Sequence, residues 1–164
     1  METFDAISKR ASVREYQSQP IKRDLLEKLV DAGRRAPTAR AVEPWEFVVI
    51  TDKEILKQLG KIADTGSFIK DAAACIAVFC QDTKYYLEDG CAATENILLT
   101  AEDTGLGACW VAGDKKPYAK EVSKVLNAPA GLKLVSLISL GWPRVEARQI
   151  KKRGLNNVIH WERF

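Results

Sequence analysis

The hydrophobic and polar positions alternate between helical and strand spacing along most of the chain. Apolar residues at helical spacing predict helices over residues 3–9, 23–35, 52–63, 85–103 and 117–126. Segments rich in apolar, β-branched or aromatic residues predict strands over residues 45–51, 72–80, 107–112 and 132–140. No internal repeat or linker interrupts these elements, so we expect one domain over residues 1–164.

Three of these elements carry more specific expectations. The almost continuous apolar run at 72–80 is typical of a strand buried on both faces. The helix at 85–103 has apolar positions over more than one stripe, which indicates a central helix or one at a subunit contact. In the first helix, we expect Thr3 to be the N-cap and Phe4 and Ile7 to point inward.

The last segment, residues 144–164, is basic yet ends in four large apolar residues, Val158, Ile159, Trp161 and Phe164. Apolar side chains on a terminal extension normally need another surface to cover them. A tail wrapped over a partner subunit would provide that surface. The tail therefore predicts a homodimer.

Composition limits the classes of function. The 25 basic and 22 acidic residues give a net charge of only +3, which argues against a dedicated nucleic-acid-binding protein. No apolar run approaches the length of a membrane span, and the N-terminus lacks the features of a signal peptide. The cysteines and the one histidine do not form a zinc motif, so no metal site is expected and the thiols are expected to be buried and reduced. These features favour a cytoplasmic protein.

The alternation of strands and helices also prompts a search for a dinucleotide-binding fingerprint. Gly105 and Gly107 precede a predicted strand, whereas the fingerprint needs glycines between a strand and a helix. A Walker loop is absent as well. A phosphate group would therefore have to be bound by side chains.

Arg10, Ser12 and Arg14 are candidates for that role. In an extended backbone, residues two apart point to the same side, roughly 6.5 Å from each other. Two guanidinium groups and a hydroxyl on one side match the oxygens of a phosphate or another anion. A solvated strand edge would show the same alternation, so the spacing alone leaves both interpretations open.

Four segments in order resemble the FMN-dependent nitroreductases. The first is residues 10–14, with the arginine–serine–basic pattern of that family. The second, residues 36–45, is similar to the family's Ala-Pro-Ser loop that ends in Gln-Pro-Trp. The others are the glycine–leucine–glycine strand at 105–113 and Gly-Trp-Pro at 141–143, which is followed by a basic and aromatic tail.

The resemblance implies an α+β fold, with a central sheet flanked by helices and an intertwined homodimer that exchanges C-terminal tails. It implies one FMN at each subunit interface. Side chains that would surround its phosphate are Arg10, Ser12, Lys151 and Arg153. Arg14 would lie at the pyrimidine edge of the ring, and the backbone at Ala112 and Gly113 would approach its hydride-accepting nitrogen. Four residues would come from the opposite subunit: Pro37, Thr38, Ala39 and Ala41.

The implied reaction is hydride transfer from NADH or NADPH to FMN and then to a nitroaromatic compound, a quinone or a similar acceptor. Each substrate would leave before the next binds, and no catalytic side chain is expected because the flavin carries the chemistry. Two alternatives stay open. One is another flavin reaction on the same scaffold, such as reductive dehalogenation or flavin cleavage. The other is a module without enzyme activity that binds polyanions.

The sequence departs from the family pattern in the second segment. Ala41 stands where the family commonly has asparagine, and Glu43 stands where it has glutamine. The stretch between Ile50 and Ala72 is also short and lacks the extra helices of larger members. These departures leave the acceptor open more than the cofactor.

Overall fold

A four-stranded antiparallel sheet forms the centre of the computed structural model, which describes residues 1–164. Its strands are β1 (Trp45–Ile50), β2 (Ala74–Gln81), β3 (Gly107–Ala112) and β4 (Leu132–Gly141), in the order β1-β2-β4-β3. Every neighbouring pair is antiparallel. All four strands lie close to their predicted bounds. The antiparallel order differs from the parallel sheet of dinucleotide-binding folds, in agreement with the missing glycine fingerprint.

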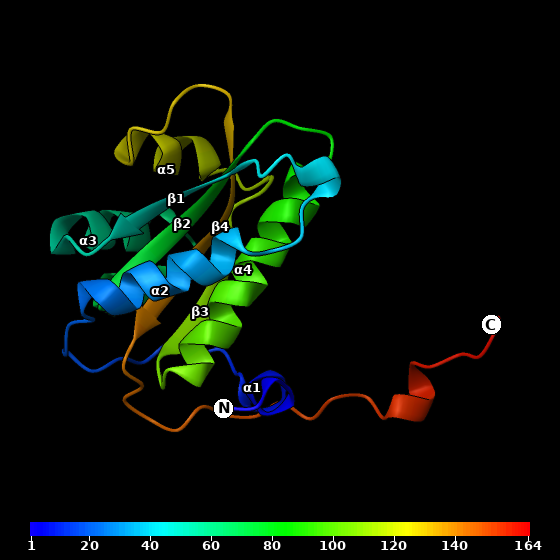
Figure 1. The fold of residues 1–164 in the computed structure, drawn as a ribbon. Coiled ribbons are helices and arrows are strands. Elements are labelled where there is room, and N and C mark those ends of the chain that lie inside the picture. Colours follow the sequence, from blue (N-terminus) through cyan, green and yellow to red (C-terminus); the bar gives the residue numbers. More distant parts are fainter.

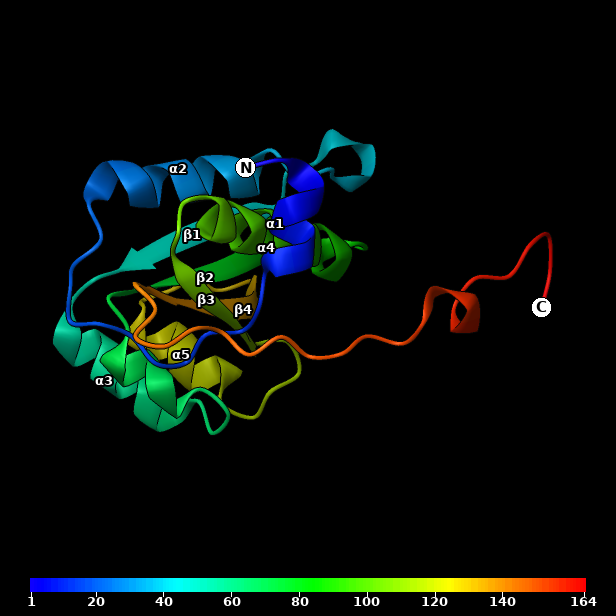
Figure 2. The same cartoon turned by 90° about the horizontal axis from the view of Figure 1, so that it is seen from below.

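Helices cover both faces of the sheet (Figures 1 and 2). α2 (Arg23–Arg34) and α4 (Tyr86–Asp103) lie on one face, whereas α3 (Lys53–Ile62) and α5 (Ala119–Val125) lie on the other. This arrangement confirms the expected α+β architecture of a central sheet flanked by helices. None of these helices combines the length and apolar character that crossing a bilayer requires.

β2 is buried on both faces, as its apolar run predicted. Successive side chains of a strand point to opposite faces, and the two cores divide accordingly. Ile76 and Val78 belong to the core beneath α2 and α4. Ala77 and Phe79 belong to the core beneath α3 and α5. One strand thus joins two apolar layers, which explains why its sequence shows no polar alternation.

α4 is the longest helix and packs against both the sheet and α2, which agrees with a central position, one of the two alternatives that its apolar pattern left open. A Cβ atom at Gly90 would lie 2.6 Å from Cγ2 of Val135 on β4, so the helix approaches the sheet closely only because that residue is glycine. On the side facing α2, Asn96 Nδ2 donates a hydrogen bond to the Ala32 carbonyl at 3.0 Å.

α1 (Thr3–Lys9) forms where predicted, but its expected orientation is wrong. Phe4 is 77% exposed and Ile7 is 52% exposed, whereas the small Ala6 is the buried residue. The N-terminal amine lies 2.9 Å from Oδ1 of Asp103 at the end of α4, which ties the start of α1 to that helix. The predicted cap is also wrong, because Glu2 occupies the N-cap position without a side-chain hydrogen bond.

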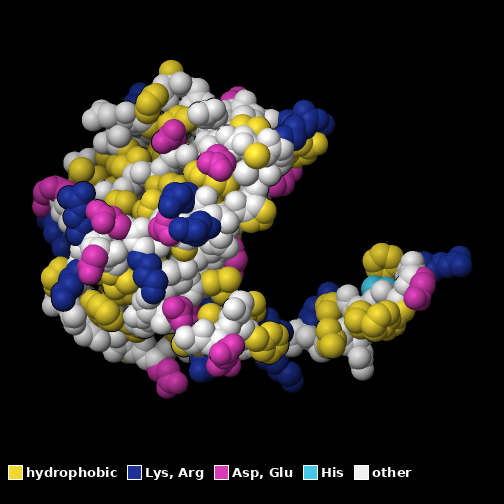
Figure 3. All heavy atoms as spheres, in the orientation of Figure 1, with side chains coloured by type: hydrophobic (Ala, Val, Ile, Leu, Met, Phe, Trp, Pro, Cys, Tyr) yellow, Lys and Arg dark blue, Asp and Glu magenta, His cyan; other side chains and the backbone are white.

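The tail, residues 144–164, leaves the body beside α1 and extends away from it (Figures 1 and 2). It contains one short 3-10 turn, η3 (Leu155–Asn157). Hydrophobic side chains gather on this detached segment (Figure 3). The exposed apolar residues on it include Ile150, Leu155, Val158, Trp161 and Phe164. No surface of the same chain covers these side chains, and wrapping over a partner subunit stays a prediction.

Candidate functional site

The segment at residues 10–14 runs extended along β3. Ser12 forms a parallel bridge with Ala108, and the Val13 N–H donates to the Ala108 carbonyl at 2.9 Å. Val13 is buried, while Ser12 and Arg14 on either side are exposed. Side chains of this segment therefore alternate between buried and exposed, as predicted for an extended backbone. The pairing with β3 fixes the direction in which the segment runs.

A groove of about 660 Å³ lies between this segment and the start of the tail. Its lining carries cations from both: Arg10, Arg14, Arg148, Lys151 and Lys152. No acidic side chain lines it, so the groove concentrates positive potential on one surface. Ser12 adds a hydroxyl group. The groove suits an anion with several acceptor oxygens, such as a phosphate.

The groove brings together four of the residues predicted to surround a phosphate or its attached ring, but not all of them. Arg10, Ser12, Arg14 and Lys151 line it, whereas Arg153 does not. Arg153 Nη2 instead donates to the Asn157 carbonyl at 2.6 Å, because the tail turns there into η3.

Within the groove, the two predicted arginines have different neighbours. Arg10 Nε lies 3.8 Å from Oε1 of Glu95 on α4. The Arg14 guanidinium lies 5.6 Å from the centre of the Phe68 ring, close enough for a cation–π contact. The sequence analysis missed Arg148 and Gln149 as lining residues. Only the general basic character of the tail pointed to them.

The second predicted group, Pro37, Thr38, Ala39 and Ala41, lies in the loop between α2 and β1. This loop contains the 3-10 turn η1 (Ala39–Ala41) and packs against the first turns of α4. Oδ2 of Asp89 accepts a hydrogen bond from Thr38 Oγ1 at 2.9 Å, and its Oδ1 accepts from the Ala39 N–H at 3.0 Å. Asp89 is a functional candidate that the sequence analysis missed, since a single acidic residue near a helix start is common.

The third predicted group, Ala112 and Gly113, ends β3. The Tyr118 hydroxyl donates to the Ala112 carbonyl, which holds the backbone in place. A Cβ atom at Gly113 would lie 2.6 Å from Cγ of Leu134, so only glycine fits there. Ala112 lies four positions after Ala108, the partner of Ser12, which is about 13 Å along a strand. An elongated ligand along β3 would thus reach from the cationic groove to this small-residue end.

The second and third groups share one end of the molecule. Figure 1 shows η1 at the N-terminal end of α4, and α1 with the adjoining tail on the side of its C-terminal end. Tyr86, also in the first turn of α4, donates from its hydroxyl to Oδ1 of Asp114 at 2.5 Å. This hydrogen bond raises the pKa of Tyr86 to about 12, so the phenol stays protonated at neutral pH. The first turn of α4 therefore holds both loops.

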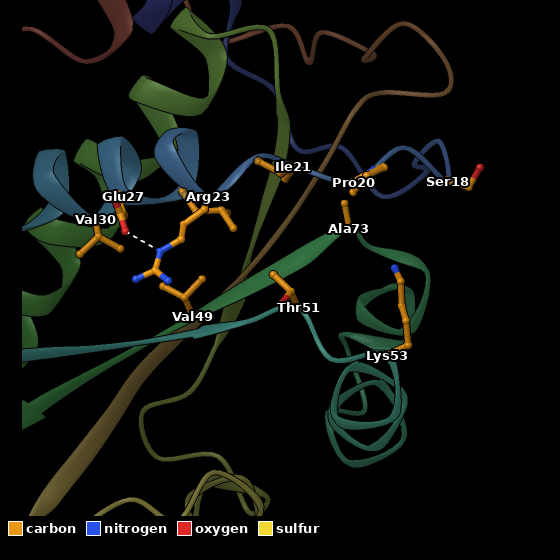
Figure 4. Close-up of a pocket in the computed structure, with 11 residues that line it drawn as sticks. Ser18, Pro20, Ile21, Arg23, Glu27, Val30, Val49, Thr51, Lys53 and Ala73 are labelled. Atoms are coloured by element: carbon orange, nitrogen blue, oxygen red, sulfur yellow. Dashed lines mark hydrogen bonds and ion pairs between the residues drawn. The ribbon is translucent and has the colours of Figure 1, made fainter.

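Another cavity, of about 680 Å³, lies between α2 and the edge strand β1 (Figure 4). None of the predicted site residues lines it. Its two cations already have partners, since Arg23 Nε lies 2.7 Å from Oε1 of Glu27 and Lys53 Nζ donates to the Ala72 carbonyl at 2.8 Å. This cavity therefore offers a ligand less unpaired positive charge than the groove beside β3 does.

The four cysteines are free, as expected, and three of them are buried. Burial raises the pKa of Cys75 and of Cys80 to about 12. Burial also raises the pKa of Cys109, which lies beside Ser12, although Arg14 and Arg10 oppose that shift. These thiols are protonated at neutral pH and act as small core residues, not as nucleophiles.

Substitution of Gly107 by alanine tests how closely the 10–14 segment packs on β3. A Cβ atom there would lie 2.7 Å from Cβ of Val13. We expect Gly107→Ala to lower the free energy of unfolding by about 1–3 kcal/mol, because the backbone of one segment must shift. Urea denaturation measures the loss. Gly154→Ala is the matched control, since its nearest heavy atom is 3.6 Å away. Equal stability of both variants would contradict the close packing.

Comparisons with known proteins identify the family. A profile of the nitroreductase family matches residues 7–89 and 65–142. A protein from Archaeoglobus fulgidus, provisionally named NADH dehydrogenase/NAD(P)H nitroreductase, is 33% identical over 153 residues, which cover 88% of this chain and 87% of that protein.

Solved structures share the fold. A crystal structure from Bacteroides thetaiotaomicron, of a protein with the same provisional name, has a TM-score of 0.94 at 30% identity and covers 99% of this chain and 98% of its own. An FMN-dependent nitroreductase from Clostridium difficile has a TM-score of 0.88 at 26% identity, covering 98% of this chain and 99% of its own. The family profile matches most of the length of the chain, and the expected motifs lie at both ends of β3. The chain therefore belongs to the nitroreductase family of oxidoreductases.

Proposed function

We propose that the chain is an FMN-dependent oxidoreductase that transfers hydride from NADH or NADPH to a nitroaromatic compound, a quinone or a similar acceptor. The observation that carries this proposal is the arrangement along β3 in a nitroreductase-family chain. A groove with five cations and no acidic lining residue lies at one end, and small residues with a closely packed backbone lie at the other.

The residues present fit FMN at both ends. Its phosphate needs several donors, which Arg10, Ser12 and Lys151 supply in the groove. Its flat ring needs a wall without large side chains, which Ala112 and Gly113 supply. When bound, FMN supplies the hydride chemistry that no amino-acid side chain offers.

The cations of this chain then have separate roles. Arg10 and Lys151 bind the phosphate, and Arg153 would join them if the tail moves from its bond with Asn157. Arg14 sits one step further along the same side of the segment, where its fixed positive charge would stabilise negative charge at the pyrimidine edge of the ring. The Phe68 ring beneath the Arg14 guanidinium restricts its orientation.

The proposed site needs two subunits. Pro37, Thr38, Ala39 and Ala41 would complete the ring pocket of a partner chain, and residues 144–164 would wrap over that partner. Supporting this assembly, the tail exposes large apolar side chains that its own chain does not cover. Unpaired cysteines are typical of reducing compartments, so a cytoplasmic location belongs to the proposal as well.

We further propose that the reductant and the acceptor use one pocket in turn. The residues that the chain places at the ring end, Ala112 and Gly113, are small, so the exposed face of the ring would offer one position to either substrate. In steady-state assays this order gives parallel double-reciprocal lines.

A halogenated phenol among the acceptors tests the alternative reaction of reductive dehalogenation.

The purified protein is expected to be yellow and to release FMN on denaturation, because the cationic groove binds the phosphate that distinguishes FMN from riboflavin. Absorbance of the native protein and chromatography of the released flavin measure this. Release of FAD, or no flavin binding even after reconstitution with FMN, would contradict the proposed function.

A further inference from the structure

Asp89 is a buried carboxylate whose hydrogen bonds all lead to one loop. It lies on α4 and is 5% exposed. No lysine, arginine or histidine lies within ion-pair distance of it. Its side-chain partners are Thr38 Oγ1 and the Ala39 N–H. A buried charge without a cationic partner is costly for folding, so global stability does not explain this residue well.

The loop formed by residues 38–43 is strained. Arg40, Ala41 and Glu43 have φ values of +58°, +53° and +50°, in the left-handed region that favours glycine. The Thr38 hydroxyl, which donates to Asp89, also accepts a hydrogen bond from the Glu43 N–H at 3.1 Å. Asp89 therefore holds the start of the loop through Thr38 and Ala39. The hydrogen bond from the Glu43 N–H to the Thr38 hydroxyl then fixes the end of the loop. Strained backbone persists where the surroundings over-determine it.

The same helical turn also supports a second loop. Tyr86 lies three residues before Asp89 and therefore on the same face of α4. Its hydroxyl fixes Asp114, directly after Ala112 and Gly113. Under the proposed function, these two loops belong to different cofactor sites. Ala112 and Gly113 serve the FMN of their own subunit, whereas Thr38, Ala39 and Ala41 serve the FMN of the partner.

We propose that Asp89 is a positioning residue that acts in trans. It fixes the 38–43 loop in the conformation that completes the partner's FMN site, although its own helix turn supports the site of the subunit that carries it. This inference rests on the proposed function and adds to it a residue that touches neither the cofactor nor the substrate.

Two substitutions separate positioning from stability. Asp89→Leu removes both acceptors at similar volume, and we expect the homodimer to bind FMN about tenfold more weakly, because the loop loses its two charge-assisted hydrogen bonds. Its thermal midpoint without FMN should not fall, since an unpaired buried charge is also removed. Asp89→Asn keeps one carbonyl acceptor for the Ala39 N–H and should restore part of the affinity.

Thr94→Val is the matched control on the same helix. Thr94 is buried, and its hydroxyl bonds the Gly90 carbonyl and Ser136 Oγ, away from the 38–43 loop. This variant should lower the thermal midpoint and leave the affinity for FMN unchanged. FMN fluorescence quenching on titration of the apoprotein measures the affinity in each case.

Mixed dimers test the action in trans. One subunit carries Arg10→Ala and the other Asp89→Leu, each with its own affinity tag, so that sequential purification isolates the mixed pair. If Asp89 acts on the partner's site, both defects fall in one site and the other is entirely native. Half of the sites should then bind FMN with wild-type affinity.

The opposite results are equally clear. Two sites that are each weakened by a single defect would show that Asp89 acts within its own subunit, and would overturn the inference. Wild-type affinity in the Asp89→Leu homodimer would overturn it too. Failure of the wild-type protein to bind FMN would contradict the proposed function itself, an outcome that the unsubstituted control reveals separately.

Discussion

Deleting residues 156–164 is expected to convert the proposed dimer to monomers and to release FMN. The deleted segment carries Val158, Trp161 and Phe164, which are 50%, 75% and 104% exposed on the single chain, and also Ile159. Covering such side chains on a partner contributes about 1.5–3 kcal/mol each, enough together to govern association. Because Thr38 and Ala41 would contact the flavin of the other subunit, loss of the dimer and loss of the cofactor should occur together.

Light scattering combined with flavin absorbance, over a range of protein concentrations, measures both quantities. The deletion also removes the Asn157 carbonyl, which accepts a hydrogen bond from Arg153. A full-length variant with Val158, Ile159, Trp161 and Phe164 replaced by serine keeps that carbonyl and is the control for this effect. If either variant stays dimeric and yellow, the tail does not hold the dimer together.

Arg10→Ala is expected to weaken FMN binding by roughly tenfold to hundredfold. A charge-assisted hydrogen bond to a phosphate contributes on the order of 1.5–3 kcal/mol, and Arg10 is fixed in the groove by the pairing of its segment with β3. Lys152→Ala should cost less. Lys152 also lines the groove, but it lies on the tail between the residues that match the family pattern.

Titration of the apoproteins with FMN compares the two variants. Arg10→Lys keeps the charge but not the two-pronged geometry of the guanidinium, so its affinity should lie between those of wild type and Arg10→Ala. Glu95→Gln removes the carboxylate 3.8 Å from Arg10 and should not weaken binding. Equal losses for Arg10→Ala and Lys152→Ala would show that the groove acts only through its total charge.

Local sequence patterns predicted the helices and strands, and also the extended segment at residues 10–14. The unbroken apolar run of β2 predicts a strand that is buried on both faces. In the structure, β2 lies between the two apolar cores. The alternate placement of Arg10, Ser12 and Arg14 needs only an extended backbone to bring them to one side. Both properties follow from side-chain periodicity over a few neighbouring residues, which the sequence displays directly.

Contacts between distant parts of the chain were not predictable from these patterns. Asp89 and Thr38 form a hydrogen bond although they are 51 positions apart in the sequence. Arg40 and Ala41 have left-handed backbone angles, but arginine and alanine rarely adopt that conformation, so the residue types do not predict it. Phe4 and Ile7 have the right spacing for a buried stripe, yet Ala6 is the residue of α1 that faces inward. In this packing the N-terminal amine forms an ion pair with Asp103 at the end of α4. Such contacts depend on the packing of whole elements against one another, so the apolar pattern of a single segment cannot specify them.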